Sequence, residues 1–178
     1  MHRASRLRSQ TMTRASVGGF RPSEAQLFGM RFFALLIGAS VLAWAVSLPD
    51  RLGAAQRALA GSGAWVARLT GGAAHAIGDQ IGVAGLSMDI NYECTGVYVV
   101  LILFVFLFAY PASWRARLVG AAIGVIALTI VNVLRIAFLV RIAELAPDLF
   151  GYFHEYVWQG VFLVLVIAYA MTWVERVR

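Results

Sequence analysis

The sequence contains no lysine, few acidic residues and a single cysteine, and each shortage narrows the classes of protein it can encode. The 15 permanently positive side chains are all arginines, against 9 aspartates and glutamates. The lone cysteine, Cys94, excludes an internal disulfide and a cysteine-rich metal site, but it leaves a reactive thiol possible in any compartment. The net charge of +6 does not indicate nucleic-acid binding, because the arginines cluster beside apolar segments, where membrane topology accounts for them.

Apolar residues, in contrast, are abundant. Hydrophobic residues make up 61% of the 178 residues and charged residues 13%, and the mean hydropathy is +0.77. Soluble domains are usually about half apolar and about a quarter charged. The composition therefore predicts an all-α integral membrane protein, with the lipid bilayer as its first partner.

The first 25 residues are basic and contain little that could form a core. Their arginines stand among Ser, Thr and Gly, with no acidic residue before Glu24, which predicts a disordered cytoplasmic tail over residues 1–25. Residues 26–178 are predicted to form a single membrane-embedded domain. Its first apolar segment, residues 27–48, is long enough to span about 30 Å of hydrocarbon. A cleavable signal peptide ending near Ala45 is the alternative, but the long basic region before it favours a retained anchor.

Residues 51–85 differ in character, because they are rich in Gly and Ala. Apolar residues recur there at near-helical spacing and arginines interrupt them, which predicts one or two amphipathic helices on the membrane surface. A re-entrant path over residues 54–77 stays open as the alternative. Within residues 82–90, Gly85 separates two short runs of branched residues, which predicts a tight hairpin on the extracytoplasmic side.

Three more apolar segments follow, at residues 94–111, 118–140 and 156–174. The loop between the first two carries Arg115 and Arg117 and no acid, whereas residues 141–155 hold three acidic residues and one arginine. The positive-inside rule then places the Arg115 loop and both termini in the cytoplasm. Together with residues 27–48, these segments predict four transmembrane helices in the inner (cytoplasmic) membrane.

This topology brings three polar residues to one face of the bilayer. Cys94 opens the second span from outside, Arg135 approaches the outer end of the third, and His154 precedes the fourth. Hydropathy alone does not require that agreement. We therefore expect these side chains to form a thiol active site on the extracytoplasmic face.

Cys94 stands between Glu93 and Thr95-Gly96 at the start of an apolar run. A lone cysteine in a membrane helix is most often a packing residue. A thiol at a helix N-terminus, however, lies near partly positive N–H groups that favour the thiolate, and Gly96 leaves the backbone unobstructed. Glu93 opposes the thiolate by its like charge unless it turns outward or pairs with an arginine.

Arg135 lies inside an apolar segment, where an unsatisfied arginine costs about 3 kcal/mol or more. Asn132 is three residues earlier, on the same helix face. A structural Arg135 would pair with Glu144 or Asp148, or would extend to the outer surface. A functional one would hold a thiolate, a substrate carbonyl or a developing oxyanion.

His154 precedes the last apolar segment and has aromatic neighbours. It fits an interfacial polar residue, and it equally fits a base that takes a proton from Cys94 and later returns it to a leaving amine. His75 lacks such a setting. The sequence shows no cluster of three or four metal ligands, no serine-hydrolase elbow and no phosphate-binding glycine loop, so neither metal nor cofactor is expected.

Three blocks of the sequence resemble the signature blocks of the exosortase/archaeosortase family of membrane cysteine transpeptidases. They are Glu93-Cys94-Thr95-Gly96, Asn132-Val133-Leu134-Arg135-Ile136, and His154 ahead of Gln159-Gly160. The resemblance covers about residues 86–178, and the short chain is similar to compact members such as exosortase H. It implies that Cys94 is the nucleophile, Arg135 the stabilising arginine and His154 the acid and base. It also implies supporting or substrate-binding roles for Glu93, Thr95, Gly96, Asn132 and Gln159.

Members of that family act on exported, membrane-anchored proteins that end in a short motif, one transmembrane helix and a basic tail. The implied reaction is attack by Cys94 on a peptide bond at the motif, formation of a thioester, and release by an acceptor nucleophile or water. Because the chain is shorter than many members, the resemblance leaves the recognition motif and the acceptor open.

The alternative from another class is a non-catalytic membrane subunit or a small transporter. Asn132 and Arg135 would then line a polar path, and Cys94 would serve only in packing. Outer labelling of Cys94 by a membrane-impermeant thiol reagent, blocked by a substrate peptide, favours the enzyme over this alternative.

Overall fold

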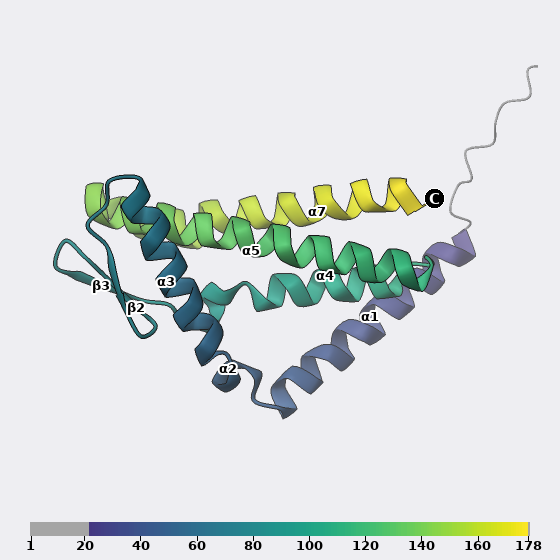
Figure 1. Ribbon diagram of the computed structural model, residues 1–178. Helices are drawn as coiled ribbons and strands as arrows, with labels where there is room; N and C mark the ends of the chain where they lie inside the picture. Colours follow the sequence, from purple (N-terminus) through teal and green to yellow (C-terminus); the bar gives the residue numbers. More distant parts are fainter. Residues whose placement is uncertain (1–21, 178) are drawn as a thin grey trace, which may run out of the picture.

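The computed structural model describes residues 22–177 of the chain. Its long helices are α1 (Pro22–Ala45), α4 (Val97–Ala109), α5 (Trp114–Leu145) and α7 (Trp158–Val177). Figure 1 shows α5 and α7 side by side along their length, α4 next to them, and α1 running obliquely away from the other helices. The prediction of an all-α membrane protein is confirmed.

Three helical segments are long and apolar enough to cross a membrane, namely Ser23–Ala45, Trp114–Leu145 and Pro147–Val177. The fourth predicted span corresponds to α4, a shorter apolar helix of 13 residues. At about 1.5 Å per residue, α4 is about 20 Å long, less than the hydrocarbon thickness of about 30 Å. A short 3₁₀ turn, η1 (Tyr92–Thr95), precedes α4 and continues the chain beyond it.

The start of α1 lies earlier than predicted. Residues 22–25, which the sequence analysis assigned to the basic tail, form the first turn of α1. The remainder of that tail, residues 1–21, lies outside the described residues. At the other end, α1 stops at Ala45, and a turn at Ser47 with φ 48° leads into the short α2 (Leu48–Arg51).

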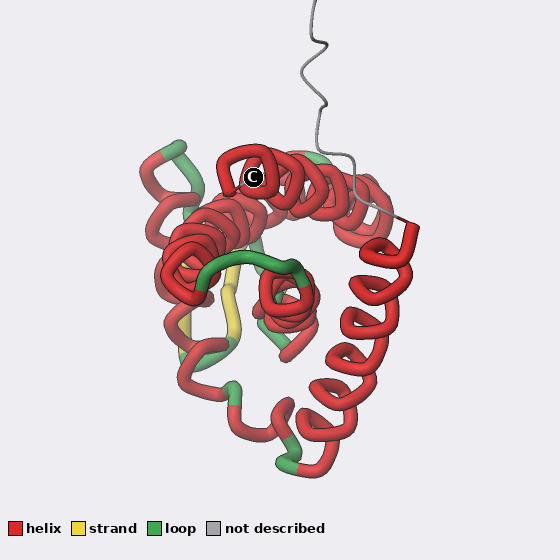
Figure 2. The backbone as a smooth tube through the Cα atoms, turned by 90° about the vertical axis from the view of Figure 1, so that its right-hand side faces the viewer, coloured by secondary structure: helices red, strands yellow, loops and turns green. Residues whose placement is uncertain are grey.

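The helix α4 lies at the centre of the long helices. It packs against α1, α5 and α7. Figure 2 views α4, α5 and α7 nearly end on and shows α4 between the α5–α7 pair and α1, which runs down the right-hand side. Its residues are apolar on every side, which suits a helix enclosed by others. Leu103 and Leu107 accordingly have no exposed surface. The outer side of α1 instead exposes Phe33, Ile37 and Val41.

Of the predicted amphipathic region, residues 51–85, one part forms a helix, α3 (Gly53–Leu69), that crosses α5 (Figure 1). The helical prediction is wrong for His75–Ile77 and Gln80–Val83, which are strands. The buried face of α3 consists of small residues, with Ala60, Ala64 and Ala67 fully enclosed. A Cβ on Gly63 would lie 2.4 Å from the Ile136 side chain, so this close crossing requires glycine. The apolar face of α3 therefore packs against α5. The expected location of α3 on the membrane surface stays a prediction.

A small antiparallel sheet follows α3, in the order β1 (His75–Ile77), β2 (Gln80–Val83) and β3 (Leu86–Asp89). The predicted hairpin is the β2–β3 pair. Its two turn residues, Ala84 and Gly85, have φ values of 50° and 80°, as in the primed turns that close two-residue hairpins. The strand β1 was not predicted, because three residues are too few to show an alternating pattern.

One end of the molecule collects most of the irregular structure. The sheet, η1 and the end of α5 meet there, next to α3 (Figure 1). Three short turns at the same end connect α5 to α7, namely η2 (Pro147–Leu149), α6 (Phe150–Tyr152) and the π-helical turn η3 (Phe153–Val157). The polar residues of interest come from these segments.

Candidate active site

A cavity of about 470 Å³ lies at this end of the molecule, between the sheet and α5. Cys94, Arg135 and His154 all border it, although they come from η1, the middle of α5 and η3. The structure thus brings together the three side chains that the sequence analysis singled out. The remaining walls are β3 and the apolar residues near the end of α5.

Cys94 is held by hydrogen bonds to its backbone. The Asn91 side-chain oxygen accepts from the Cys94 N–H at 3.1 Å, and the Asn132 side-chain amide donates to the Cys94 carbonyl at 2.7 Å. Gly96, with φ 70°, then turns the chain from η1 into α4, a conformation that favours glycine. These bonds fix the backbone on both sides of the sulfur and leave the thiol free to face the cavity.

The Cys94 thiol is 8% exposed. Burial raises its pKa above the ordinary value, while the positive charge of Arg135 and the Asn91 hydrogen bond act in the opposite direction. Burial is the larger effect, and it disfavours the thiolate. A neutral thiol needs a base to become a nucleophile.

That base is within reach. The Nε2 atom of His154 lies 3.9 Å from the Cys94 sulfur, the upper end of a sulfur hydrogen bond. Its ring stacks on Phe150, with centroids 5.6 Å apart and planes 13° from parallel. His154 belongs to η3, and π-helical turns of this kind often occur at functional sites. The stacking sets the plane in which the imidazole meets the sulfur.

Arg135 is a buried cation without a counter-ion. Its side chain is 9% exposed, and its guanidinium makes no hydrogen bond or ion pair within residues 22–177. Glu144, which a structural arginine would use, pairs instead with Arg141 on the next turn of α5. The guanidinium carbon lies 5.7 Å from the centre of the Phe162 ring, a cation–π contact that supplies only part of the stabilisation a buried charge needs.

The supporting residues fall into two groups. Asn132, 2% exposed, bonds to Cys94, and Thr95 shapes the turn by donating to the Tyr92 carbonyl at 2.6 Å and accepting from the Val97 N–H at 3.3 Å. Glu93 and Gln159, by contrast, are exposed and do not border the cavity. The Glu93 carboxylate accepts a hydrogen bond from the Tyr92 hydroxyl at 3.3 Å. It therefore turns outward, which is one of the two arrangements expected from the sequence.

Three residues at the site were not identified from the sequence. Asn91 orients Cys94, Phe150 supports His154, and Phe162 lies beside Arg135. Asn91 carried a detectable signal, because asparagine is a preferred residue immediately before a helical turn. Phe150 and Phe162 carried none, since aromatic residues occur throughout this apolar chain.

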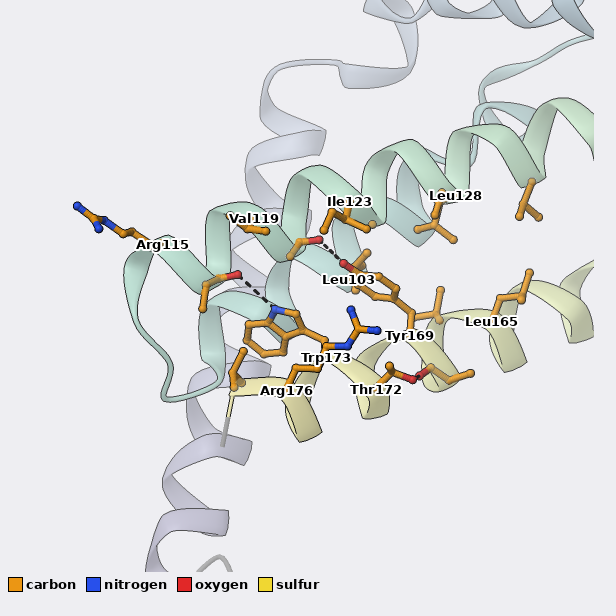
Figure 3. A pocket seen from close by; sticks show the side chains of 18 residues that line it. Leu103, Arg115, Val119, Ile123, Leu128, Leu165, Tyr169, Thr172, Trp173 and Arg176 are labelled. Carbon is orange, nitrogen blue, oxygen red and sulfur yellow. Dashed lines mark hydrogen bonds between the residues drawn. The ribbon is translucent and has the colours of Figure 1, made fainter.

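A larger cavity of about 650 Å³ lies between the first half of α5 and the second half of α7, at the other end of the molecule (Figure 3). Its lining is almost wholly apolar, with Arg115 and Arg176 among its few charged residues. The Tyr169 hydroxyl donates to the Gly120 carbonyl and the Trp173 indole donates to the Ala116 carbonyl, as the dashed lines show. None of the described residues that line this groove carries a thiol, an imidazole or a carboxylate, so its size alone does not mark it as a reactive site.

Residues 22–177 hold no group of three or more His, Cys, Asp or Glu side chains placed to bind a metal ion. The smaller cavity is lined by a thiol, an imidazole and a guanidinium, together with the Asp89 carboxylate and the Ser87 hydroxyl.

Comparison with known proteins bears on the whole chain. No curated protein and no solved structure matches it. A family model described as transmembrane exosortase matches residues 15–174. This range includes Cys94, Arg135 and His154 and all described helices except the last three residues of α7. The chain therefore belongs to the transmembrane exosortase family.

Proposed function

We propose that this protein is a membrane cysteine transpeptidase that cleaves the C-terminal sorting signal of exported proteins. Exosortase membership makes it a membrane protein related to protein sorting. The step from there to an activity rests on one observation, the contact between the Cys94 sulfur and His154 beside the unpaired, buried Arg135. A nucleophile, a base and a cation in one cavity are the components that acyl transfer needs.

The reaction begins with a proton transfer. His154 Nε2 accepts the proton of the Cys94 thiol as the sulfur attacks the carbonyl carbon of the scissile peptide bond. A carbon–sulfur bond forms, and the carbonyl electrons move onto the oxygen. A neutral thiol is compatible with this step, because the base at 3.9 Å has only to move closer when substrate fills the cavity.

The Arg135 guanidinium supplies positive charge for that oxygen. It is already desolvated and has no anion among the described residues, so a developing oxyanion would be its first strong partner. Removing one such donor from an acyl-transfer site typically costs about 10²–10³ in rate. The cost of burying the arginine in the resting protein is thereby offset in the transition state.

The intermediate then breaks down at the carbon–nitrogen bond. His154 returns its proton to the leaving amine, which departs with the transmembrane helix and basic tail, and the rest of the substrate stays on Cys94 as a thioester. A second nucleophile, an amine or water, gives its proton to His154, attacks the thioester and restores the thiol.

The bilayer orientation follows from charge. The groove at the other end of the molecule is bordered by Arg115 and Arg176, the arginines that the positive-inside rule assigns to the cytoplasm. The Cys94 cavity would then open on the extracytoplasmic face, with both termini inside. A transporter has less support, because the larger groove is apolar and offers no polar path along α5 and α7.

The decisive test replaces Cys94. Wild type, Cys94→Ala and the control Ser62→Ala, a small substitution on the exposed side of α3, are expressed with a membrane-anchored exported protein that ends in a helix and a basic tail. We expect Cys94→Ala to abolish processing, a loss of at least about 10⁴-fold for a covalent nucleophile, while the variant remains in the membrane. Hydroxylamine should release a trapped substrate from the wild type alone. Normal processing by Cys94→Ala would remove Cys94 as the nucleophile.

A further inference from the structure

We propose that the substrate polypeptide binds as an added strand along the free edge of β3, which guides the scissile bond to Cys94. The inference rests on the proposed function and concerns how the peptide is held. It assigns a role to the small sheet, which supplies none of the three side chains Cys94, Arg135 and His154. The recognised class is an extended stretch of peptide, held mainly through its backbone.

β3 is an exposed edge. The strand order places β1 and β3 at the two sides of the sheet. The β1 side packs against α3, whereas β3 packs closely only against β2 among the described elements. Unpaired strand edges present rows of N–H and C=O groups that can pair with another chain.

The register shows which backbone groups are free. The Ile90 N–H donates to the Asp79 carbonyl at 2.9 Å, so Ile90 faces β2. Backbone direction alternates along a strand, so Leu86 and Met88 also face β2, while Ser87 and Asp89 direct their N–H and C=O groups away from the sheet. Within residues 22–177 these outward groups bond to no other backbone segment.

The cavity runs along this edge. All four residues of β3 border it, although consecutive side chains of a strand point to opposite faces. The cavity therefore follows the whole length of β3. The same cavity continues past Ile90 and Asn91 to the Cys94 sulfur and His154. A peptide paired with Ser87 and Asp89 would therefore reach the nucleophile without leaving the cavity.

The opposite wall suits side chains of a bound strand. It is formed by Ile136, Leu139 and Ala143 of α5, all apolar. In an added strand, the side chain of every second residue would point toward this wall. Main-chain hydrogen bonds to β3 would hold the strand in place. A bound helix fits less well, because its backbone groups are already paired and would leave Ser87 and Asp89 unsatisfied.

The probe for a test is a thiol alkylator with and without a peptide. The full chain in lipid nanodiscs is treated with acetyl-trialanine chloromethyl ketone or with iodoacetamide, and alkylation of Cys94 is followed by intact mass. In the reaction with the chloromethyl ketone, the Cys94 sulfur bonds to the methylene carbon and displaces chloride. The thiol proton goes to His154 or to solvent. The ratio of the two rates, taken within one variant, reports peptide binding and cancels general damage to the thiol site.

N-methylation of the probe tests the pairing on the wild-type protein. A methyl group on an amide that donates to β3 removes the donor and blocks close approach, whereas the next amide along a strand points away. We expect one of two adjacent N-methyl probes to lose about fivefold or more in the rate ratio and the other to change less than twofold. Equal effects at both amides would overturn strand addition.

Ser87→Pro tests the same pairing from the protein side. Proline removes the outward N–H of Ser87 without removing a bond to β2, as edge strands tolerate. The rate ratio should fall about fivefold, while Ser87→Ala, which keeps the N–H and removes only the hydroxyl, should keep the wild-type ratio within twofold. An unchanged ratio in Ser87→Pro, or an equal loss in both variants, would contradict the inference.

The two hypotheses fail separately. If Cys94→Ala abolishes processing in cells but neither the methyl scan nor Ser87→Pro alters the ratio, the enzyme stands and the β3 edge is not its peptide site. If Cys94→Ala processes normally, the proposed function fails, whatever the probes show.

Discussion

The two cavities of this protein differ in how their polar groups are satisfied. In the groove between α5 and α7, Tyr169, Trp173 and Thr172 each donate to a backbone carbonyl (Figure 3). At the smaller cavity, Nε of Arg135 is buried without a hydrogen-bond partner among the described residues, and so is the side-chain oxygen of Asn132, which bonds to Cys94 through its amide but does not border the cavity. Among the described residues, no side chain that lines the groove has a buried polar atom without a partner, whereas Arg135 of the smaller cavity has one.

This difference in hydrogen bonding says more about where a ligand could act than the sizes of the cavities do. Buried polar groups are normally hydrogen-bonded, and each exception needs an explanation. An arginine kept from any carboxylate, while its neighbour Arg141 takes the available Glu144, is such an exception. The hydrogen-bonded side chains of the groove stabilise the α5–α7 pair. A buried polar side chain without a partner, by contrast, marks a place where a ligand or a reaction can use its hydrogen-bonding groups. If the comparison is right, substitutions at the two ends should affect different measurements.

After Cys94 itself, the largest effect is expected at His154. His154→Ala removes the base at 3.9 Å from the sulfur, and general acid–base catalysis contributes about 10²–10⁴ in rate, so processing should fall by about 10³. The matched control is His75→Ala in β1, which is outside the Cys94 cavity and should process normally. Initial processing rates of the two alanine variants measure this contrast. Equal losses in the two would deny His154 a special role.

A smaller loss is expected for Arg135→Lys. A lysine keeps the charge but not the planar fork of donors, so processing should fall by about 10² with the protein still in the membrane. Arg115→Lys, at the α5–α7 groove, should change the rate less than twofold. Pulse-chase processing in cells, with membrane fractionation, gives both readouts. Wild-type rates in Arg135→Lys would make that residue structural.

Asn132 is expected to act as a positioning residue. Asn132→Ala leaves the Cys94 carbonyl without its buried donor, which should cost about 1–3 kcal/mol of unfolding free energy. The displaced thiol should also lower processing about tenfold. Denaturation in micelles measures the first effect, and the rate of Cys94 alkylation by iodoacetamide separates the second from simple destabilisation. A stability loss with unchanged alkylation and processing would leave Asn132 with a purely structural role.

The smallest effect belongs to the groove. Tyr169→Phe removes the hydroxyl that donates to the Gly120 carbonyl, a change of about 1 kcal/mol in unfolding free energy. Processing should stay within twofold of the wild type, because no reactive group lies there. A strong loss of processing in a stably folded Tyr169→Phe would break the comparison between the two ends.

Much of the fold was predictable because the signals are local. Apolar runs located the four long helices, with limits that differ from the observed ones by a few residues. Gly85 between two short runs located the β2–β3 hairpin, since the turn needs a residue that tolerates positive φ. The strand β1 and the π-helical turn η3 escaped prediction, because each depends on packing against neighbours rather than on a repeating pattern.

The candidate site was predictable in part. The three blocks of the sequence contain the three residues that meet at the cavity, yet Glu93 and Gln159 of the same blocks face away from it. Asn91 and Phe150 position Cys94 and His154 and were not singled out. Proximity in a short motif therefore did not decide which of its residues border the cavity, because side-chain direction changes within η1 and α7.

From the sequence alone it follows that this chain enters a membrane, which segments become its long helices and which side chains are candidates for a reaction. These properties follow from local composition, since lipid solvation and backbone hydrogen bonding act on each segment separately. The tertiary structure was needed to show that Cys94 meets a histidine 60 residues away and that Arg135 pairs with no carboxylate of residues 22–177. The reason is that such contacts depend on how α5, η1 and η3 pack together, and no single segment carries that information.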